Sequence, residues 1–512
     1  MTSSSKSTNG HTNGLRQRPV SSTTETATSS NGTKTNSTTT TTTTTSQHDQ
    51  QVDSKVIMEF GGPLGVSFLM IFFPLLMWYL HSCIFLFDGQ YVSPWTFLQN
   101  ASSVIELFFP TTMSIQLYIG FTFYQAFTAY TCPGVIVKGL PVPSLQGKQL
   151  SYLCNGITTW YIDLILLVVL HYTNILPTQI WIQHIHGIVT VSILWSYIVS
   201  TIAYLTAILT QSTHRMSNNH LYDYFMGASL NPRIGTWLDL KMFTEIRIPW
   251  KFLFLISLSA AVKDHQYNIS TPTANTLQPL AFMGIHTSAP FLFMTLAHGL
   301  YVNACMKGEE CIPTTWDIFY EKWGYMLIFW NLAGVPLTYC HASLYLSHRA
   351  HTLHNPVIHS SLYTTILFIV LLLAYYVWDT ANSQKNRFRM QERGTYIERN
   401  TFPQLPWGTL KNPTYIQTKQ GNKLLTGGWW GVARKIHYTA DLIMALSWGL
   451  ISGGPWNEGG LWSPIPYFYV CFFTTVLIHR MSRDVNLCKQ KYGDDWDRYC
   501  KVVPYTFIPG II

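Results

Sequence analysis

Charged residues are scarce in this chain. Of its 512 residues, 11% are Asp, Glu, Lys or Arg, whereas 47% are hydrophobic and 15% are aromatic. A soluble globular domain carries roughly 25% charged residues, so the composition argues against water as the main solvent and indicates a lipid bilayer. The mean hydropathy is only +0.14 because residues 1–55 are polar and include the threonine run Thr38–Thr45. We expect these residues to form a disordered cytoplasmic tail.

Features that mark other classes of protein are also missing. No apolar h-region starts the chain, so we expect no cleavable signal peptide. The nine cysteines have no metal-ligand spacing, so no metal site is expected. No transporter-type repeat is visible, and the basic residues are too scattered for a nucleic-acid-binding module. The basic clusters at Arg387–Arg393 and Arg480–Arg483 fit either positive-inside topology or a pocket for a phosphorylated cofactor.

Long apolar segments, by contrast, are abundant. A membrane-spanning helix needs about 18 or more mostly apolar residues. Clear candidates are residues 64–87, 157–176, 184–210, 277–303, 324–347 and 358–379, and weaker ones are 108–130, 249–263, 436–453 and 464–480. Tryptophan and tyrosine crowd the segment ends, as in an interfacial belt. The sequence predicts an all-α polytopic membrane protein with about ten transmembrane helices.

Polarity along the chain predicts three regions. The tail 1–55 precedes a transmembrane region at 56–380, which is followed by a C-terminal cofactor-binding region at 381–512. The last region starts with a long polar stretch and contains only two short apolar segments. This mixture suits an enzyme that takes one substrate from the lipid and another from the cytosol, with a cytosol-facing pocket for the second.

Ionisable residues are concentrated in the segment DYFMGASLNPRIGTWLDLKMFTEIRIPW, residues 223–250. Lys241 and Glu245 are four residues apart and would pair on a helix face. Ionisable groups this close to a bilayer are costly unless they are paired or functional. Asp239 and Glu245 are therefore candidate catalytic acids, and support of a neighbouring site is the alternative.

Two further polar segments allow more than one interpretation. Tyr339 lies among apolar residues in the predicted helix 324–347. It is a candidate proton donor to an apolar substrate, and a helix–helix hydrogen bond is the alternative. The segment GLPVPSLQGKQLSYLCNG, residues 139–156, is interpreted as a loop because of its prolines and glycines.

The C-terminal third carries the strongest combination of residues. Lys385 and Arg389 are four residues apart, so on a helix they direct two cations at one anion. Another helical stripe with four-residue spacing is formed by Asp484, Cys488 and Tyr492. Basic groups for phosphates, aromatic rings for a base and an acid for a ribose hydroxyl suit a dinucleotide. Because no G-x-G-x-x-G follows a strand, we expect no Rossmann domain.

These motifs resemble those of the membrane sterol reductase family, which includes sterol C-14 reductases, 7-dehydrocholesterol reductase and sterol C-24(28) reductases. The resemblance covers about residues 58–512. It is carried by the C-terminal blocks LLTGGWWGVARKIHYTADLIMALSWG and YGDDWDRYCKVVPYTFIPGI. The earlier blocks FGGPLGVSFLMIFFPLLMWYLH, GLPVPSLQGKQLSYLCNG and YFMGASLNPRIG are most similar to the fungal C-24(28) branch, which acts in the last step to ergosterol.

The resemblance implies NADPH as the cofactor and makes residues 56–380 the sterol-binding region. The implied cofactor-binding positions are Lys385, Arg389, Leu425, Trp430, His437, Tyr438, Asp484, Cys488, Tyr492 and Tyr499. Many relatives have Asn-Tyr where this chain has His437 and Tyr438, and a histidine can also donate a hydrogen bond. The resemblance also places Tyr339 near the sterol and leaves Asp239 and Glu245 as candidate acids.

The implied activity is ionic reduction of an alkene in an endoplasmic-reticulum membrane. A proton adds to carbon 28 of an ergosta-tetraenol, and NADPH delivers hydride to carbon 24. The sterol enters from the bilayer, and membrane lipid and other sterol-pathway enzymes are expected partners. Three alternatives stay open: a C-14 or C-7 reductase of the same family, an isoprenylcysteine methyltransferase, and a non-enzymatic sterol-binding protein.

Overall fold

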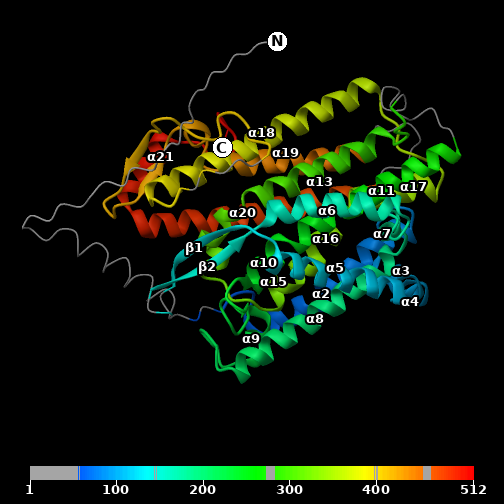
Figure 1. The fold of residues 1–512 in the computed structure, drawn as a ribbon, viewed down its shortest axis with the longest axis horizontal. Coiled ribbons are helices and arrows are strands. Elements are labelled where there is room, and N and C mark those ends of the chain that lie inside the picture. The colour runs from blue at the N-terminus through cyan, green and yellow to red at the C-terminus, as the bar shows by residue number, and fades with distance from the viewer. Residues whose placement is uncertain are drawn as a thin grey trace, which may run out of the picture.

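A computed structural model describes residues 56, 58–142, 145, 147–271, 283–396, 398, 402–453 and 463–511. The predicted tail 1–55 lies outside these residues, as does the start of the predicted span 277–303. The described chain is mainly helical, and its long helices run roughly side by side (Figure 1). They are α2 (Gly62–Phe85), α5 (Thr112–Thr131), α6 (Gly156–Tyr172), α8 (Ile185–Leu209), α11 (Ile248–Ser270), α13 (Ala289–Lys307), α18 (Ser361–Glu392), α19 (Ile436–Ile451) and α20 (Phe468–Tyr492).

Shorter helices connect the long ones. They are α3 (Pro94–Gln99), α4 (Ala101–Phe108), α7 (Ile180–Gln183), α9 (His220–Met226), α10 (Leu240–Ile246), α14 (Trp316–Phe319) and α21 (Asp494–Val502), with 3₁₀ turns at Glu309–Thr314, Gly428–Gly431 and Ile465–Tyr467. In Figure 1, α21 and the hairpin of β1 (Val135–Val142) and β2 (Lys148–Cys154) lie at one end of the long helices, and α17 (His341–His351) lies at the other.

Four helices in the described ranges, α2, α8, α13 and α18, are long and apolar enough to cross a membrane. The pair α4–α5, which is bent by 57°, adds a fifth if it forms one span. The other predicted spans also fall on helices. However, α6 and α19 are shorter, and α11 and α20 carry several charged residues. The protein is thus a mainly helical membrane protein, and the figure of about ten spans stays a prediction.

The expectation of one helix at 324–347 is wrong. The segment consists of α15 (Tyr325–Phe329), a π-helical turn at Trp330–Gly334, α16 (Val335–Thr338) and the start of α17 (His341–His351). Pro336 has no N–H to donate to the carbonyl of Leu332 four residues earlier. That carbonyl instead accepts a hydrogen bond from the Tyr118 hydroxyl of α5. The proline therefore accounts for the π-helical turn before α16, and Tyr339 lies in the short turn that separates α16 from α17.

The prediction of a purely α-helical fold also needs correction, because the structure contains three two-stranded antiparallel sheets. They pair β1 (Val135–Val142) with β2 (Lys148–Cys154), β3 (Arg233–Ile234) with β4 (Leu238–Asp239), and β5 (Tyr415–Gln417) with β6 (Lys423–Leu425). Much of the segment 139–156, interpreted as a loop, belongs to the first hairpin. The register shifts between Lys138 and Pro141, and such an irregularity accommodates a proline within a strand.

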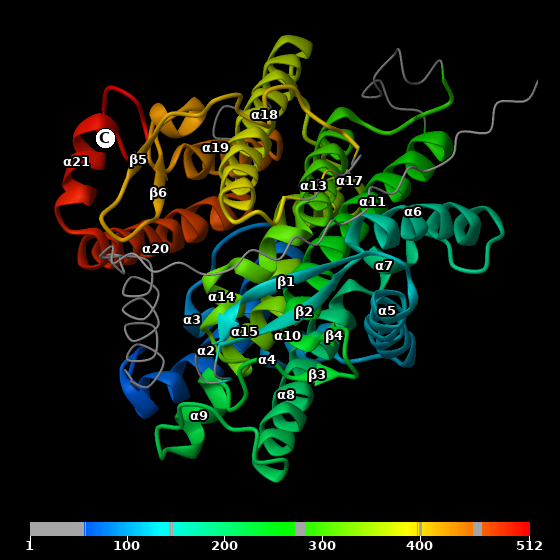
Figure 2. The same cartoon turned by 60° about the vertical axis from the view of Figure 1, so that its left-hand side comes forward.

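The C-terminal part has a small apolar core of its own, separate from the large core between the long helices. Ile416, Trp496, Tyr499 and Val503 are buried together and hold α21 against β5. In Figure 2, α21 and the β5–β6 hairpin lie beside α20, away from α5 and α8. Because α18 runs unbroken past residue 380, it connects the membrane core directly to this part, and the division at 380/381 stays a prediction.

Candidate active site

A cavity of about 840 Å³ lies between α13, α18, α19, α20 and α21. One part of its wall, here called the basic end, is formed by Lys385, Arg389, Arg434, Lys435, Arg480 and Asp484. The other part, the aromatic end, is formed by Trp250, Tyr301, Tyr339, Trp378, Asp441 and Phe473. The cavity therefore joins a charged compartment to an apolar one.

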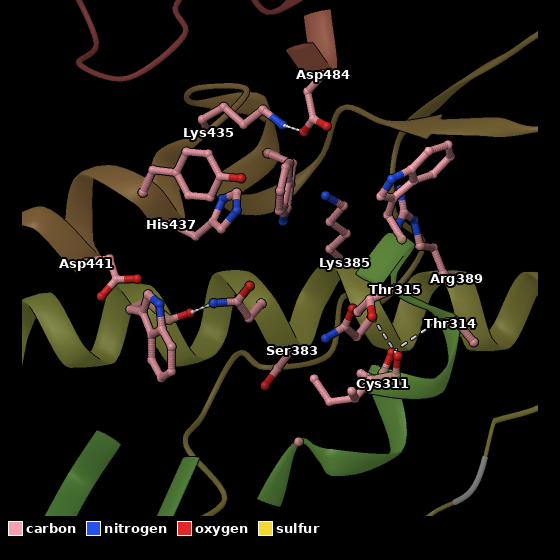
Figure 3. Close-up of a pocket in the computed structure, with 18 of the residues that line it drawn as sticks. Cys311, Thr314, Thr315, Ser383, Lys385, Arg389, Lys435, His437, Asp441 and Asp484 are labelled. Carbon is pink, nitrogen blue, oxygen red and sulfur yellow. Dashed lines mark hydrogen bonds and ion pairs between the residues drawn. The ribbon is translucent and has the colours of Figure 1, made fainter. Parts of the chain in front are cut away.

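Helix α18 forms one long wall of this cavity. Its cavity-lining residues include Trp378, Asn382, Lys385 and Arg389, which are three or four residues apart. With a rise of 1.5 Å per residue they extend over roughly 16 Å. Figure 3 shows Lys385 and Arg389 leaving α18 toward the same space. The wall is thus long enough for an elongated ligand whose anionic part lies at the basic end.

Lys385 is half-buried and Arg389 is exposed, and both lie on the cavity wall. The Lys385 ammonium lies 4.2 Å from the centre of the Trp430 ring, a cation–π contact. In the described part of the chain neither cation forms an ion pair, and the neighbouring Asp484 is already paired with Lys435. Because Lys385 is partly removed from water, a nearby anion would stabilise its charge, and the arrangement therefore favours a ligand that brings the negative charge.

The ion pair between Lys435 and Asp484 faces α18 (Figure 3). Burial alone would raise the pKa of Asp484, but the Lys435 ammonium and neighbouring cations hold it below its ordinary value of 3.8. Cys488 and Tyr492 follow at four-residue intervals on α20 and line the same cavity. The predicted stripe on α20 therefore lies on the cavity wall, with its acid ionised.

Two buried nitrogen atoms beside the cavity have no hydrogen-bond partner among the described residues: Nδ1 of His437 and Nε of Arg434. The His437 ring lies 5.0 Å from the Trp430 ring and 4.3 Å from the Tyr438 ring. Arg434 uses another guanidinium nitrogen to donate to the carbonyl of Val503. Unsatisfied buried polar atoms are rare in folded proteins, so these atoms mark a place where a ligand can supply hydrogen-bonding groups.

Each of the predicted cofactor-binding residues lies on the cavity wall. These are Lys385, Arg389, Leu425, Trp430, His437, Tyr438, Asp484, Cys488, Tyr492 and Tyr499. They come from α18, β6, the turn Gly428–Gly431, α19, α20 and α21. The structure thus brings together side chains that are separated by up to 114 residues in the sequence (385 to 499). Their contact with a cofactor stays a prediction.

The predicted acids Asp239 and Glu245 do not line this cavity. Asp239 accepts a hydrogen bond from the Met242 N–H at the start of α10 and pairs with Arg233 at 3.3 Å. Burial raises the pKa of Glu245, and repulsion from Asp317 adds to this effect. Asp239 therefore caps the start of α10 and pairs with Arg233, and neither acid lines the cavity.

Tyr339, the third predicted catalytic residue, does line the cavity, at its aromatic end. Its ring centre lies 4.0 Å from that of Tyr469 and 6.4 Å from that of Trp250. This side chain is held by neighbouring rings while it borders the cavity. It is therefore placed to contact an apolar ligand, and its role in proton transfer stays a prediction.

Asp441 is a cavity residue that the sequence interpretation missed. It is buried on α19 and accepts hydrogen bonds from the Tyr301 hydroxyl and the Trp378 indole. A carboxyl group within the apolar segment 436–453 could have been noticed, since ionisable groups inside membrane segments are commonly functional. The cavity can thus hold an anionic, elongated ligand at one end and offer a carboxyl group at the other.

The sequence matches the Ergosterol biosynthesis ERG4/ERG24 family over residues 54–512. It is 44% identical to the Delta(24(24(1)))-sterol reductase erg4A of Aspergillus fumigatus, over 89% of this chain and 93% of that protein. It is 42% identical to the Delta(24(24(1)))-sterol reductase of Gibberella zeae, over 91% of this chain and 74% of that protein. It is also 33% identical to the Delta(14)-sterol reductase of Methylotuvimicrobium alcaliphilum, over 91% and 99% of the two chains.

Proposed function

The chain belongs to the Ergosterol biosynthesis ERG4/ERG24 family, and from this premise we propose that it is an NADPH-dependent sterol reductase. Its substrate is an ergosta-tetraenol, and the bond reduced is the C-24(28) double bond, in the last step of ergosterol biosynthesis. The observation that carries the proposal is the similarity, over nearly the whole chain, to two fungal Delta(24(24(1)))-sterol reductases.

The cavity supports the cofactor part of the proposal. Lys385 and Arg389 are cations without acid partners in the described structure, and Arg434 and His437 present unsatisfied nitrogens. These groups fit the phosphates and polar edges of a dinucleotide. Trp430 provides an aromatic surface on the same wall. When bound, NADPH supplies a hydride.

The aromatic end supports the sterol part. Rings from four elements, including Trp250, Tyr301, Tyr339 and Trp378, line it. Such a surface excludes water and matches an apolar side chain. We place the protein in the endoplasmic-reticulum membrane as a multi-pass protein, with the basic end toward the cytosol and the sterol entering from the bilayer. Membrane lipid and other sterol-pathway enzymes are its proposed partners.

The proposal is tested with the purified protein in detergent micelles and NADPH. An ergosta-tetraenol with a 24(28) double bond and a sterol with a C-14 double bond are supplied separately, and the products are analysed by mass spectrometry. We expect the mass of the first sterol to rise by two hydrogens and the second sterol to remain unchanged. Reduction of the C-14 sterol alone would contradict the assignment.

A C-14 reductase is the second candidate, because Delta(14)-sterol reductases such as that of Dictyostelium discoideum are 35% identical over 89% of this chain. The same experiment distinguishes the two activities. If the protein binds both sterols and reduces neither in the presence of NADPH, a non-enzymatic sterol-binding function replaces both.

A further inference from the structure

Reduction of an isolated alkene by hydride needs a proton donor, because hydride adds readily only to a carbon that bears positive charge. The carboxyl groups on the described cavity wall are those of Glu310, Asp379, Asp441 and Asp484. Asp379 forms an ion pair with Lys307 at 2.6 Å, and Asp484 forms one with Lys435. Each of these two carboxyl groups is thus engaged by a lysine, which makes it less suited to donate a proton than a carboxyl group without a cation partner.

The remaining two carboxyl groups differ in position. Glu310 lies in the 3₁₀ turn Glu309–Thr314, outside the aromatic end, and is engaged by other residues. Asp441 is buried at the aromatic end, and its partners there are the neutral donors Tyr301 and Trp378. Within the described residues no lysine or arginine forms an ion pair with Asp441. It is thus the cavity carboxyl that is free to carry a proton.

The two helices that hold Asp441 and its partner also carry the basic end. On α19, Asp441 follows Tyr438 by three residues, which is about one helical turn. On α18, Trp378 precedes Lys385 by seven residues, which is about two turns on the same face. Figure 3 shows Asp441 above the same α18 that carries Lys385 and Arg389. A dinucleotide anchored by those two cations can extend along α18 toward Asp441.

We propose that Asp441 is the catalytic proton donor to the sterol alkene and that Tyr301 positions its proton; this inference rests on the proposed function. The Asp441 carboxyl transfers its proton to carbon 28, and the two π electrons of the C-24(28) bond form the new C–H bond. Carbon 24 is left with a positive charge, and the hydride of NADPH forms the second C–H bond there. The alkene is reduced, NADPH is oxidised to NADP⁺, and the Asp441 carboxylate regains a proton from water.

Tyr301 lies on α13 and reaches Asp441 across the helix interface. Its ring stacks on Trp378, with ring centres 4.8 Å apart, and packs against Trp250 at 4.9 Å. These contacts fix the direction from which its hydroxyl meets the carboxyl group. Tyr301 is therefore a positioning residue, since it acts through Asp441.

The central test compares Asp441→Asn with Asp441→Glu in the full-length protein. Asparagine keeps the shape and a carbonyl oxygen for Tyr301 and Trp378 but has no acidic proton. We expect kcat to fall by about 100-fold or more, the usual contribution of general acid catalysis. The dissociation constant of NADPH, followed by cofactor fluorescence, should stay within about threefold. Asp441→Glu should recover a measurable part of kcat, because it restores an acidic proton.

A binding measurement without turnover separates a catalytic role from a structural one. A sterol analogue with a protonated nitrogen in place of carbon 24 carries the charge that the reaction develops there. The ionised Asp441 stabilises that charge, so Asp441→Asn should weaken binding of the analogue by about tenfold or more. Binding of the neutral reduced sterol should change much less. Equal weakening for both ligands would overturn the proposal.

The matched control is Asp88→Asn. Asp88 pairs with His348 away from the cavity, and its side chain is 60% exposed, so this variant should keep wild-type kcat. A kcat of Asp441→Asn within threefold of wild type would overturn the proposal, and so would loss of NADPH binding in that variant. Failure of the proposed function has another signature, because the wild-type protein itself would then reduce no C-24(28) alkene.

Discussion

Two groups of charged residues in this protein differ in whether their charges are paired within the protein. The first, here called the inner network, lies between α5, α6 and α11 and consists of Gln125, Asn155, Thr159, Asp163, Arg247, Lys251 and Glu309. Arg247 pairs with Glu309 at 2.6 Å, and Lys251 pairs with Asp163 at 2.6 Å. The second group is the basic end of the cavity, where Lys385 and Arg389 have no acid partner among the described residues.

Hydrogen bonds close the inner network completely. The Thr159 hydroxyl accepts from Arg247 at 2.7 Å and from Lys251 at 3.0 Å, so it joins the two ion pairs. Arg247 also donates to the Asn155 side chain at 2.6 Å. A buried charge pair is tolerated when such bonds offset the lost hydration. Each cation of the inner network is paired with an acid, whereas Lys385 and Arg389 at the basic end have no acid partner among the described residues, and this difference separates structural from ligand-binding charge.

Replacement of one network partner is the change with the largest expected effect on stability. Arg247→Met leaves the Glu309 carboxylate buried without a cation, which costs roughly 3–5 kcal/mol. The midpoint of thermal unfolding in detergent should fall sharply. The double variant with Glu309→Leu should lose less than the single one, because no unpaired charge remains. Wild-type stability of the single variant would remove the structural role of the network.

Lys385→Ala and Arg389→Ala test whether the basic end of the cavity binds the cofactor. Loss of a charge-assisted contact to a phosphate costs roughly 1.5–3 kcal/mol, so the KM for NADPH should rise by about 10–100-fold. The KM for the sterol and the unfolding midpoint should stay close to wild type, since neither cation forms an ion pair in the described structure. Unchanged cofactor dependence in both variants would remove the two cations from the binding site.

Glu245 is a buried acid close to Lys241 and belongs neither to the inner network nor to the basic end. It allows a test of how a buried acid makes stability depend on pH. Burial raises its folded pKa above the ordinary value of 4.5. As pH rises through the interval between the two values, the unfolded state loses the proton first, so stability falls. Glu245→Gln should flatten this dependence of the unfolding free energy on pH. A slope that persists in the variant would assign the effect to another group.

Lys419→Ala should have the smallest effect. The ion pair of Lys419 with Asp494 is exposed, with 77% and 90% of the two side chains accessible. Pairs of this kind contribute about 0.5 kcal/mol or less. The unfolding midpoint and the KM for NADPH should both stay at wild-type values. A shift in the KM would show that the basic end extends to residues that do not line the cavity.

Helical periodicity explains how much of the site the sequence could predict. Four-residue spacing places Lys385 and Arg389 on one helix face, and the family resemblance added the positions on β6, α19, α20 and α21. Asp441 was missed because its partners come from α13 and α18, which are distant in the sequence. The acids Asp239 and Glu245 were proposed from their closeness to apolar segments, a signal that does not report whether a side chain faces the cavity.

The sequence by itself determined that the protein lies in a membrane, which family it belongs to and where its main helices lie. Hydrophobic runs and local motifs depend only on neighbouring residues, so they can be recognised without the tertiary structure. The match over residues 54–512 and the two fungal sterol reductases agree with the family and the reductase type that the sequence indicates. The long helices of the structure agree with the predicted helical membrane fold. The tertiary structure decided which charges are neutralised and which are not. That property depends on contacts between distant elements, such as Lys435 with Asp484 and Tyr301 with Asp441, and local spacing carries no information about them.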